Sequence, residues 1–446
     1  MKLCSRLSAT LLCGVALTLS LATPAAAEDW PGYLGLHGDG SSKESLGLTS
    51  WPKEGPPVLW KSGLGVGFGG AAVVGGRVYL LDRVEDESDV LRCRELDTGK
   101  VLWEQSFKRP GRLPYNGSRQ VPTVADGRVF AVGPFGHVYC VNAETGQTVW
   151  TKDLVGDFQA FRPNFGFAQS PIVYKNTIIL APMSRAVGFV ALAADSGEVV
   201  WKTPSIGAGG QSSPKLMTIA GVELAVMLNS GGVHAVEAAT GKGGFSWKGY
   251  RNRNAIPAPT DCGGGRFFFT GGYRGGSAMA KITRGADGQF VFKTLFQLPE
   301  GSQIPPAIKI GDHLFANFNE NRNLRNPPGL VCLGLDGKEK WRTQKSPGIE
   351  RGGLIVVDGK LLVLGGNDGI LRLIEPTGEG YKELAKAAIF EGLRRRGNNI
   401  WAPMAFSNGR LVLRSQTELK CLDLRKGAKA APKKRKEFFS RTSEGS

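Results

Sequence analysis

A short segment recurs along the chain, and its spacing constrains the fold more than any other feature. Residues 93–103 read CRELDTGKVLW and residues 140–150 read CVNAETGQTVW, so a small residue, an acid, a Thr-Gly pair and a Trp return at one spacing. Further copies lie at 191–201, 235–247 and 332–341, with weaker ones at 280–290, 373–381 and 421–427. A repeat of about 40–50 residues is typical of the blades of a β-propeller.

Each repeat is predicted to form four short antiparallel strands, because apolar and polar residues alternate between Gly-bearing turns. A single blade leaves both apolar faces uncovered, so the blades must stack into a ring. Residues 57–427 hold close to eight units, and the last unit lacks its fourth strand. Residues 56–61, PPVLWK, are predicted to supply that strand and close the ring. We therefore predict an all-β, eight-bladed propeller over 57–427; seven blades is the alternative, because the copy at 280–290 is faint.

The residues of the motif have structural roles. Gly99, Gly146, Gly197 and Gly241 suit turns with positive φ, and the acids and threonines beside them can hydrogen-bond within those turns. Cysteines take a position that holds Ala in other copies, which indicates a small buried residue. The tryptophans are predicted to pack between neighbouring blades: Trp60, Trp103, Trp150, Trp201, Trp247 and Trp341.

The repeat resembles the tryptophan-docking signature of the PQQ-like (quinoprotein) propellers: small residue, Asp, two spacers, Thr-Gly-Lys and Trp. The segment DWPGYLGLHGDGSSKE is similar to the leader of exported bacterial members. The resemblance covers nearly all of the chain after residue 27. It implies one of two branches, the PQQ- and Ca²⁺-dependent alcohol dehydrogenases or non-catalytic scaffolds of the BamB type.

The ends of the chain indicate export. Residues 1–27 have a basic start, an apolar stretch and a small-residue end, as in a secretory signal peptide cleaved after Ala27. Residues 28–56 form a leader and 428–446 a basic, disordered tail. The remaining five cysteines are odd in number and widely spaced, which argues against a disulfide framework. We expect a periplasmic or secreted, envelope-associated monomer without a transmembrane segment.

The sequence favours the non-catalytic branch. There is no Cys-Cys dipeptide, and no His or Cys spacing typical of metal ligands. Acids are sparse in the loops where Ca²⁺ would need several oxygens, and Glu350 and Asp261 stand alone. We expect no cofactor and no metal; PQQ and Ca²⁺ belong to the alternative. The net charge of +17 also allows an anionic glycan as ligand, whereas export and the lack of a base-reading motif disfavour nucleic acid.

Amides recur just before six of the eight predicted inner strands, where the loops between blades return to the axis. We predict that these residues, with nearby arginines and aromatics, line the mouth of a central channel and bind envelope proteins or extended peptides. The alternative is that the amides only cap strand ends. The candidates are Gln120, Gln169, Gln211, Asn254, Gln303, Asn399, Arg119, Arg253, Arg351 and Trp401, accompanied by Arg394 to Arg396, Phe165 and Phe167.

Overall fold

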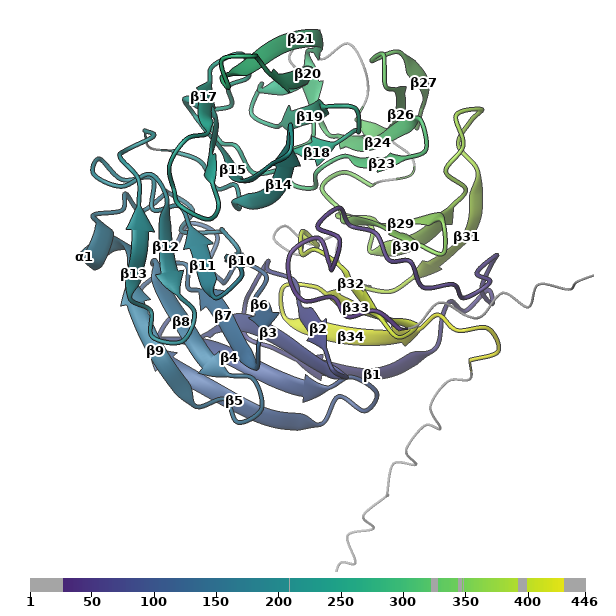
Figure 1. Cartoon of the computed structure of the whole chain (residues 1–446). Helices are drawn as coiled ribbons and strands as arrows, with labels where there is room; N and C mark the ends of the chain where they lie inside the picture. Colours follow the sequence, from purple (N-terminus) through teal and green to yellow (C-terminus); the bar gives the residue numbers. More distant parts are fainter. Residues whose placement is uncertain are drawn as a thin grey trace, which may run out of the picture.

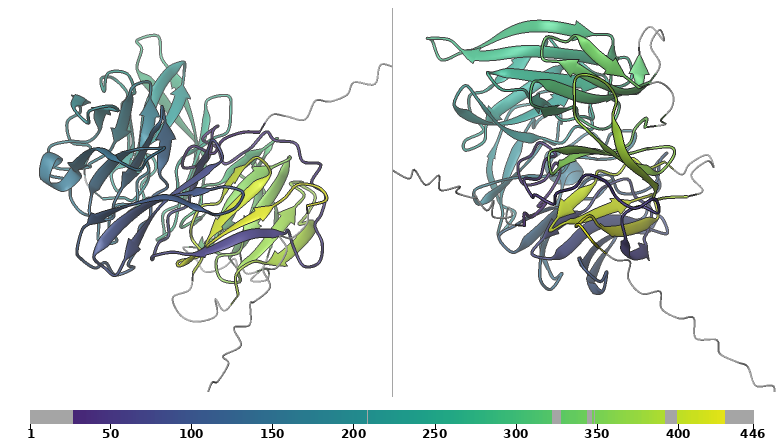
Figure 2. Two further views of the ribbon diagram at one scale, coloured as in Figure 1. Left: turned by 90° about the horizontal axis from the view of Figure 1, so that it is seen from below. Right: turned by 90° about the vertical axis from the view of Figure 1, so that its right-hand side faces the viewer.

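Eight four-stranded antiparallel sheets stand around a common axis, as Figure 1 shows for the computed structural model. The structure describes residues 27–207, 209–321, 328–343, 347, 349–391 and 399–428. The predicted all-β propeller with eight blades is confirmed. Figure 2 shows from two further sides how the blades pack face to face around the ring. No helix among these residues is long and apolar enough to cross a membrane.

The first four blades follow one another along the chain. Blade 1 comprises β2 (Ala72–Val74), β3 (Arg77–Val84), β4 (Ser88–Glu95) and β5 (Val101–Lys108). Blade 2 comprises β6 (Thr123–Ala125), β7 (Arg128–Val132), β8 (His137–Asn142) and β9 (Thr148–Asp153), followed by the helix α1 (Leu154–Phe158). Blade 3 comprises β10 (Ile172–Tyr174), β11 (Thr177–Leu180), β12 (Val190–Ala193) and β13 (Val199–Lys202). Blade 4 comprises β14 (Lys215–Ile219), β15 (Val222–Asn229), β16 (Gly232–Glu237) and β17 (Phe245–Trp247).

The second half of the ring repeats this order. Blade 5 comprises β18 (Thr260–Asp261), β19 (Arg266–Gly271), β20 (Gly276–Arg284) and β21 (Phe290–Leu298). Blade 6 comprises β23 (Ile308–Ile310), β24 (His313–Phe318), β26 (Gly329–Gly334) and β27 (Glu339–Arg342), beside a small pair of β22 (Glu300–Gly301) and β25 (Glu320–Asn321). Blade 7 comprises β28 (Leu354–Val357), β29 (Lys360–Leu364), β30 (Ile370–Ile374) and β31 (Glu383–Ala388). Blade 8 comprises β32 (Ala405–Ser407), β33 (Arg410–Arg414), β34 (Glu418–Asp423) and β1 (Val58–Gly63).

The ring is closed by the strand from the N-terminal side, as the sequence predicted. β1 pairs antiparallel with β34, and Trp60 lies opposite Cys421. The last blade is therefore built from both ends of the propeller, and the pairing covers what would otherwise be an open sheet edge.

The apolar core lies between neighbouring blades. Buried clusters join the facing sheets of consecutive blades; the largest joins blades 7, 8 and 1 across the closure. Middle strands bury both faces, whereas an outer strand such as β9 buries little more than its Trp. This pattern follows from the stacking, because a middle strand is covered on both sides and an outer strand faces solvent.

The tryptophans dock onto the following blade. The indole Nε1–H groups of Trp60, Trp103 and Trp150 donate to the carbonyl oxygens of Leu96, Ala143 and Ala194, at 2.7, 3.0 and 3.1 Å. Trp341 donates to Thr377 at 2.7 Å, and Trp201 packs on Gly241. The docking turn needs Gly because φ is positive and a Cβ at Gly99, for example, would lie 2.5 Å from the Trp60 ring.

The cysteine position is explained by the strand register. Cys93, Cys140 and Cys332 lie opposite Trp103, Trp150 and Trp341 within their own blades, and a β-bulge follows each cysteine. A small side chain is needed there because it lies beneath a bulky indole. All five cysteines from Cys93 to Cys421 are buried free thiols, and burial raises the pKa of the Cys93 thiol to about 11. They are packing residues, as predicted.

Two blades depart from the motif. In blade 4, Ala235 lies opposite Phe245, and Trp247 instead stacks on Phe292 of blade 5 at 5.4 Å between ring centroids. In blade 5 the bulge follows Met279, which lies opposite Phe296. The Phe296 ring packs against Gly337 of blade 6 and so takes the part of the missing Trp. The structural repeat of blade 5 therefore differs in register from the weak sequence copy at 280–290.

Asp97 and Glu144 of the docking turns bond differently from the sequence expectation. The carboxylate of Asp97 accepts from Nε of Arg410, in the preceding blade, at 2.8 Å. Glu144 lies 3.7 Å from Arg77 of blade 1. The threonines do stabilise the turns, since Lys100 N donates to Thr98 Oγ1 at 3.1 Å. These two acids thus link neighbouring blades and Thr98 acts within its turn, whereas Asp336 accepts from Lys338 N at 3.1 Å within its own turn.

Candidate functional site

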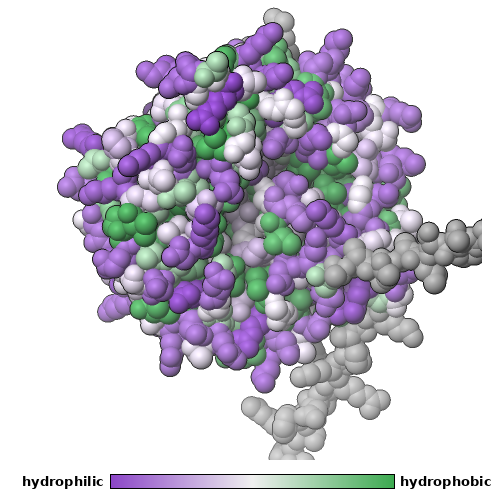
Figure 3. All heavy atoms as spheres, viewed as in Figure 1, coloured by the Kyte–Doolittle hydropathy of each residue, from purple (hydrophilic) through white to green (hydrophobic). Residues whose placement is uncertain are grey.

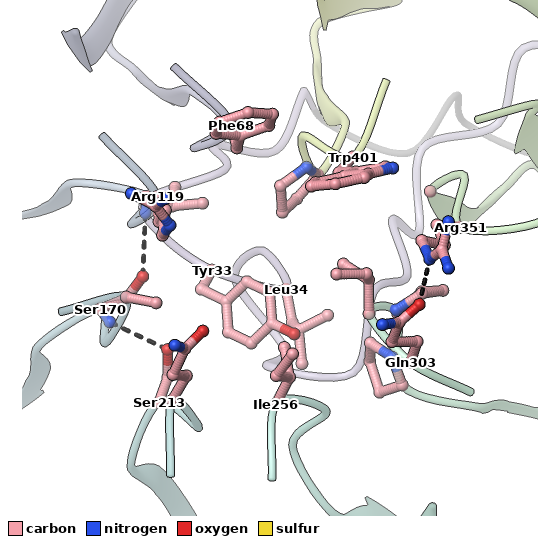
Figure 4. A pocket seen from close by; sticks show the side chains of 18 of the residues that line it. Tyr33, Leu34, Phe68, Arg119, Ser170, Ser213, Ile256, Gln303, Arg351 and Trp401 are labelled. Atoms are coloured by element: carbon pink, nitrogen blue, oxygen red, sulfur yellow. Dashed lines mark hydrogen bonds between the residues drawn. The ribbon is translucent and has the colours of Figure 1, made fainter. Parts of the chain in front are cut away.

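A pocket of about 400 Å³ lies on the propeller axis, where loops from several blades converge. Figure 3 shows a hollow at the centre of the ring, surrounded by mostly hydrophilic residues. Aromatic rings dominate the wall of the pocket: Trp30, Tyr33, Phe68, Tyr115, Phe165, Tyr273 and Trp401. Two arginines, Arg119 and Arg351, enter the same wall, and Figure 4 shows them on either side of the cavity.

The leader forms part of the wall of this pocket. Trp30 pairs with Val73 of β2 through hydrogen bonds of 2.7 and 2.8 Å, and Val124 of β6 donates to Pro31 at 2.8 Å. Further on, Ser42 donates to Val356 of β28 at 2.9 Å. The innermost strands of blades 1, 2 and 7 therefore hold the leader along the axis. From the sequence we predicted the leader only as a segment separate from the propeller. That prediction did not include the finding that Trp30, Tyr33 and Leu34 line the pocket (Figure 4).

Arg119 is a cation held in a largely desolvated position. Its guanidinium donates to the carbonyl oxygen of Gly117 at 2.7 Å and to that of Tyr115, and it lies over the Phe68 ring, 5.6 Å from the centroid. Burial lowers the pKa of Arg119 to about 10. No carboxylate among the described residues forms an ion pair with it, so its charge remains available to a ligand in the pocket.

Arg351 lies across the pocket and is oriented by a short chain of amides. Its Nε donates to Oε1 of Gln303, which also accepts from Nδ2 of Asn319 at 3.3 Å. The guanidinium lies over Trp401, 5.8 Å from the ring centroid. Among the described residues its two terminal nitrogens have no hydrogen-bond partner, so it can offer both to an anion.

Phe68 is held in the pocket wall by a buried cation. Arg414 lies beneath the segment 65–69 and donates to the carbonyl oxygens of Gly69 at 3.2 Å and Gly65 at 3.2 Å. A Cβ at Gly67 would collide with the Arg414 guanidinium, so this position of the segment requires glycine. Burial lowers the pKa of Arg414 to about 10. Arg414 was not predictable from the sequence, because it lies in a strand and matches no motif.

The predicted mouth residues divide into two groups. Six of them line the pocket together: Gln211, Gln303, Asn399, Arg119, Arg351 and Trp401. Phe165 lines it as well, whereas Phe167 is buried in the core between blades 2 and 3. Arg394, Arg395 and Arg396 lie outside the described residues.

The other four predicted residues do not line the pocket. Gln169 is buried and pairs with its own blade, since its Nε2 donates to Ala181 O at 3.0 Å and its Oε1 accepts from Ala181 N at 2.9 Å. Gln120 is buried, and neither of its side-chain polar atoms has a partner among the described residues. Asn254 is half-buried and Arg253 is exposed. Gln169 thus has the strand-capping geometry that was the alternative for these amides.

The donor set of the pocket does not suit Ca²⁺. None of the described residues lining it is Asp, Glu or His, whereas Ca²⁺ sites are usually built from several carboxylate and carbonyl oxygens. Asp261 accepts from Gly263 N at 2.8 Å in a turn, and Glu350 does not line the pocket. No group of three or more His, Cys, Asp or Glu side chains with metal-binding geometry occurs in the described ranges. Arg119 and Arg351 could bind the carboxylates of a quinone such as PQQ. However, none of the described residues in this wall supplies the carboxylate oxygens that the accompanying Ca²⁺ would need.

The closed ring of eight blades, docked by tryptophans and holding an axial pocket, has the architecture that the resemblance to the PQQ-like repeat propellers implied. The family model described as "Outer membrane protein assembly factor BamB" matches residues 86–247. No curated protein matches the chain in sequence.

Solved structures with the same fold include a BamB protein and dehydrogenases. BamB from Moraxella catarrhalis is 13% identical with a TM-score of 0.55, over 82% of this chain and 96% of that chain. A europium-containing methanol dehydrogenase is 13% identical with a TM-score of 0.61, over 86% and 89%. The quinohemoprotein alcohol dehydrogenase from Comamonas testosteroni is 14% identical with a TM-score of 0.60, over 91% and 82%. At this level of sequence identity the similarity shows the fold alone, so the function has to be inferred from the site.

Proposed function

We propose that this chain is a non-enzymatic interaction scaffold of the cell envelope, similar to BamB, that binds a partner through its axial pocket. The observation that carries the proposal is the pocket wall: two arginines stacked on aromatic rings, with no carboxylate among the described lining residues. Such a wall attracts an anion and offers no side chain of Asp, Glu or His to act as a base.

The pocket suits an acidic group attached to an apolar or aromatic one. Arg351 has free nitrogens to bind a carboxylate, and the rings of Phe68, Tyr115 and Trp401 lie close enough for apolar contact with the same ligand. A volume of about 400 Å³ holds a few side chains rather than a folded domain. An extended peptide segment of a partner protein, with an acidic residue beside an apolar one, fits these limits.

The leader would contribute to the binding surface. Trp30, Tyr33 and Leu34 line the pocket together with the loops between blades, so a bound segment would contact both. The envelope location in this proposal rests on the predicted signal peptide and on the family model over residues 86–247.

The alternative is a PQQ- and Ca²⁺-dependent alcohol dehydrogenase, which two of the neighbouring structures favour. The purified protein, incubated with PQQ and Ca²⁺, is assayed for a bound quinone spectrum and for alcohol-dependent reduction of a dye. The scaffold proposal predicts no turnover above the protein-free control. Turnover that saturates with alcohol would establish the dehydrogenase instead.

Binding itself is tested with matched fluorescent peptides. One set carries Asp or Glu beside Phe or Leu, and the other replaces each acid by its amide; fluorescence anisotropy gives Kd. Acidic peptides are expected to bind more tightly than their amide partners. The double variant Arg119→Ala/Arg351→Ala is expected to weaken binding by roughly 100-fold, at about tenfold for each charged contact.

The control variant is Arg128→Ala. Arg128 begins β7 and does not line the pocket; its guanidinium donates to Asp126 O at 3.3 Å. This substitution removes one positive charge and leaves the pocket wall intact, so we expect the Kd of the acidic peptides to be unchanged. Equal affinity for acid and amide peptides, or equal loss of affinity in the control, would refute the pocket as an anion-selective site.

A further inference from the structure

The leader is anchored from Glu28 onward. The backbone nitrogen of Glu28 donates to Oε1 of Glu44 at 3.0 Å. Its side-chain carboxylate accepts from Lys43 N at 2.7 Å and Ser42 Oγ at 3.2 Å, and lies 3.1 Å from Nε2 of His37. Ala27, by contrast, is exposed. The first anchored atom of the described chain is therefore the Glu28 nitrogen.

Glu44, the acceptor of that nitrogen, is a buried carboxylate. It is 4% exposed, and its two oxygens accept from Asn408 N at 2.7 Å and Gly409 N at 2.9 Å. These contacts tie the leader to the turn between β32 and β33 of blade 8. No Lys, Arg or His forms an ion pair with Glu44 within the described part of the chain. A buried carboxylate without a cation is destabilising unless other groups compensate its charge.

We propose that the peptide bond between Ala27 and Glu28 is the processing site, and that the α-ammonium of Glu28 created there is the cation of Glu44. A peptidase adds water across this bond. The C–N bond breaks, the water oxygen becomes part of the Ala27 carboxylate, and the Glu28 nitrogen takes up protons. With an ordinary pKa of about 7.7–8.0, the new α-amino group is mostly charged at neutral pH.

Processing changes the charge of the contact without moving it. In the precursor a neutral amide N–H donates to Glu44; in the processed chain an ammonium donates from the same nitrogen, 3.0 Å from Oε1. A charge-assisted hydrogen bond is stronger than a neutral one. The leader, which continues into Trp30 and the pocket lining, is thereby held more firmly against blade 8.

The first test determines at which residue the exported chain begins. The full-length chain is expressed in a bacterium, recovered from the periplasm or medium, and its intact mass is measured. The proposal predicts a chain that begins at Glu28. A chain that begins at any other residue overturns it.

The second test measures how much the α-ammonium group of Glu28 slows unfolding. Chains beginning at Glu28, beginning at Ala27, or beginning at an N-acetylated Glu28 are compared by their unfolding rates in denaturant. The Glu28 chain is expected to unfold roughly three- to tenfold more slowly than the other two, the difference between a charged and a neutral hydrogen bond. Glu44→Gln should abolish this difference between the three starts, even if it lowers the stability of all of them.

The matched control is Glu54→Gln, at an exposed position of the same leader. It should leave the differences between the three starts intact. Equal unfolding rates for all three starts, or a difference that survives Glu44→Gln, would overturn the proposal. The readout does not depend on what the pocket binds.

Discussion

The docking of each tryptophan on a turn glycine can be tested with two substitutions in one blade. Gly146 and Gly127 both lie in turns of blade 2, with φ of 75° and 70°. A Cβ at Gly146 would lie 2.6 Å from Cδ2 of Trp103, whereas nothing lies within 4 Å of a Cβ at Gly127. Ala at either position incurs the same backbone strain, so the difference between the two variants measures the tryptophan contact alone.

The magnitudes follow from these contacts. A non-Gly residue with positive φ costs about 1–2 kcal/mol, which we expect for Gly127→Ala. Gly146→Ala must also displace the Trp103 ring, at about 1–3 kcal/mol for overpacking. The displacement further weakens the 3.0 Å hydrogen bond from Trp103 Nε1 to Ala143 O, which contributes about 1 kcal/mol. We therefore expect Gly146→Ala to lower the free energy of unfolding by about 2–4 kcal/mol more than Gly127→Ala.

Urea unfolding followed by both tryptophan fluorescence and circular dichroism provides the assay, since coincident transitions are needed before a two-state free energy is quoted. A second comparison repeats Gly146→Ala in a Trp103→Ala background, where the extra loss should disappear. Equal destabilisation by Gly146→Ala and Gly127→Ala would refute the docking account.

Three further predictions test other parts of the structure. Because burial raises the pKa of the five thiols to about 11 or 12, iodoacetamide at pH 8 should label none of them in the folded protein and all of them in denaturant, as counted by mass spectrometry; rapid labelling of the native chain would contradict this. Burial lowers the pKa of His234, whose ring nitrogens lie 2.8 Å from Ser246 Oγ and 2.9 Å from Asn229 Oδ1. The unfolded chain then binds a proton that the folded chain binds less well, so stability should fall as the pH drops below about 6.5, and His234→Gln should reduce that slope in urea titrations between pH 7 and pH 5. If an anionic glycan binds through the basic tail, affinity for heparin should fall steeply with salt and be largely lost on deleting 429–446; the pocket proposal predicts that peptide binding survives this deletion.

Much of the fold could be predicted because the spacing of residues within the repeat reflects the pairing of strands within each blade. The spacing of Cys93 and Trp103 is the spacing of two residues that lie opposite each other across β4 and β5. The missing fourth strand of the last repeat pointed directly to β1. An insertion shifts the register before Trp247, and in blade 5 Phe296 replaces the Trp; the sequence showed both copies of the repeat but not how these side chains pack.

The site was predictable in position but not in detail. The amides before the inner strands lie near the axis, yet Gln169 turns to the backbone of its own blade while Gln303 orients Arg351. The direction of such a side chain depends on the neighbouring loop rather than on its place in the repeat. The leader does not repeat, so no periodicity could show that Trp30 and Leu34 complete the pocket.

Photocrosslinking in living cells tests the central claim, binding at the pocket mouth, most directly. A photoreactive phenylalanine analogue replaces Tyr115, which is 49% exposed and lies beside Phe165 and Trp401, or Tyr273 in another blade. A control places it at Val200 on the outer strand β13, which is 55% exposed and is not one of the residues that line the pocket. We expect adducts with the same envelope protein from both pocket positions and none from the control, and we expect Arg119→Ala/Arg351→Ala to abolish them. Adducts at Val200 but not at Tyr115 or Tyr273 would contradict binding through the axial pocket.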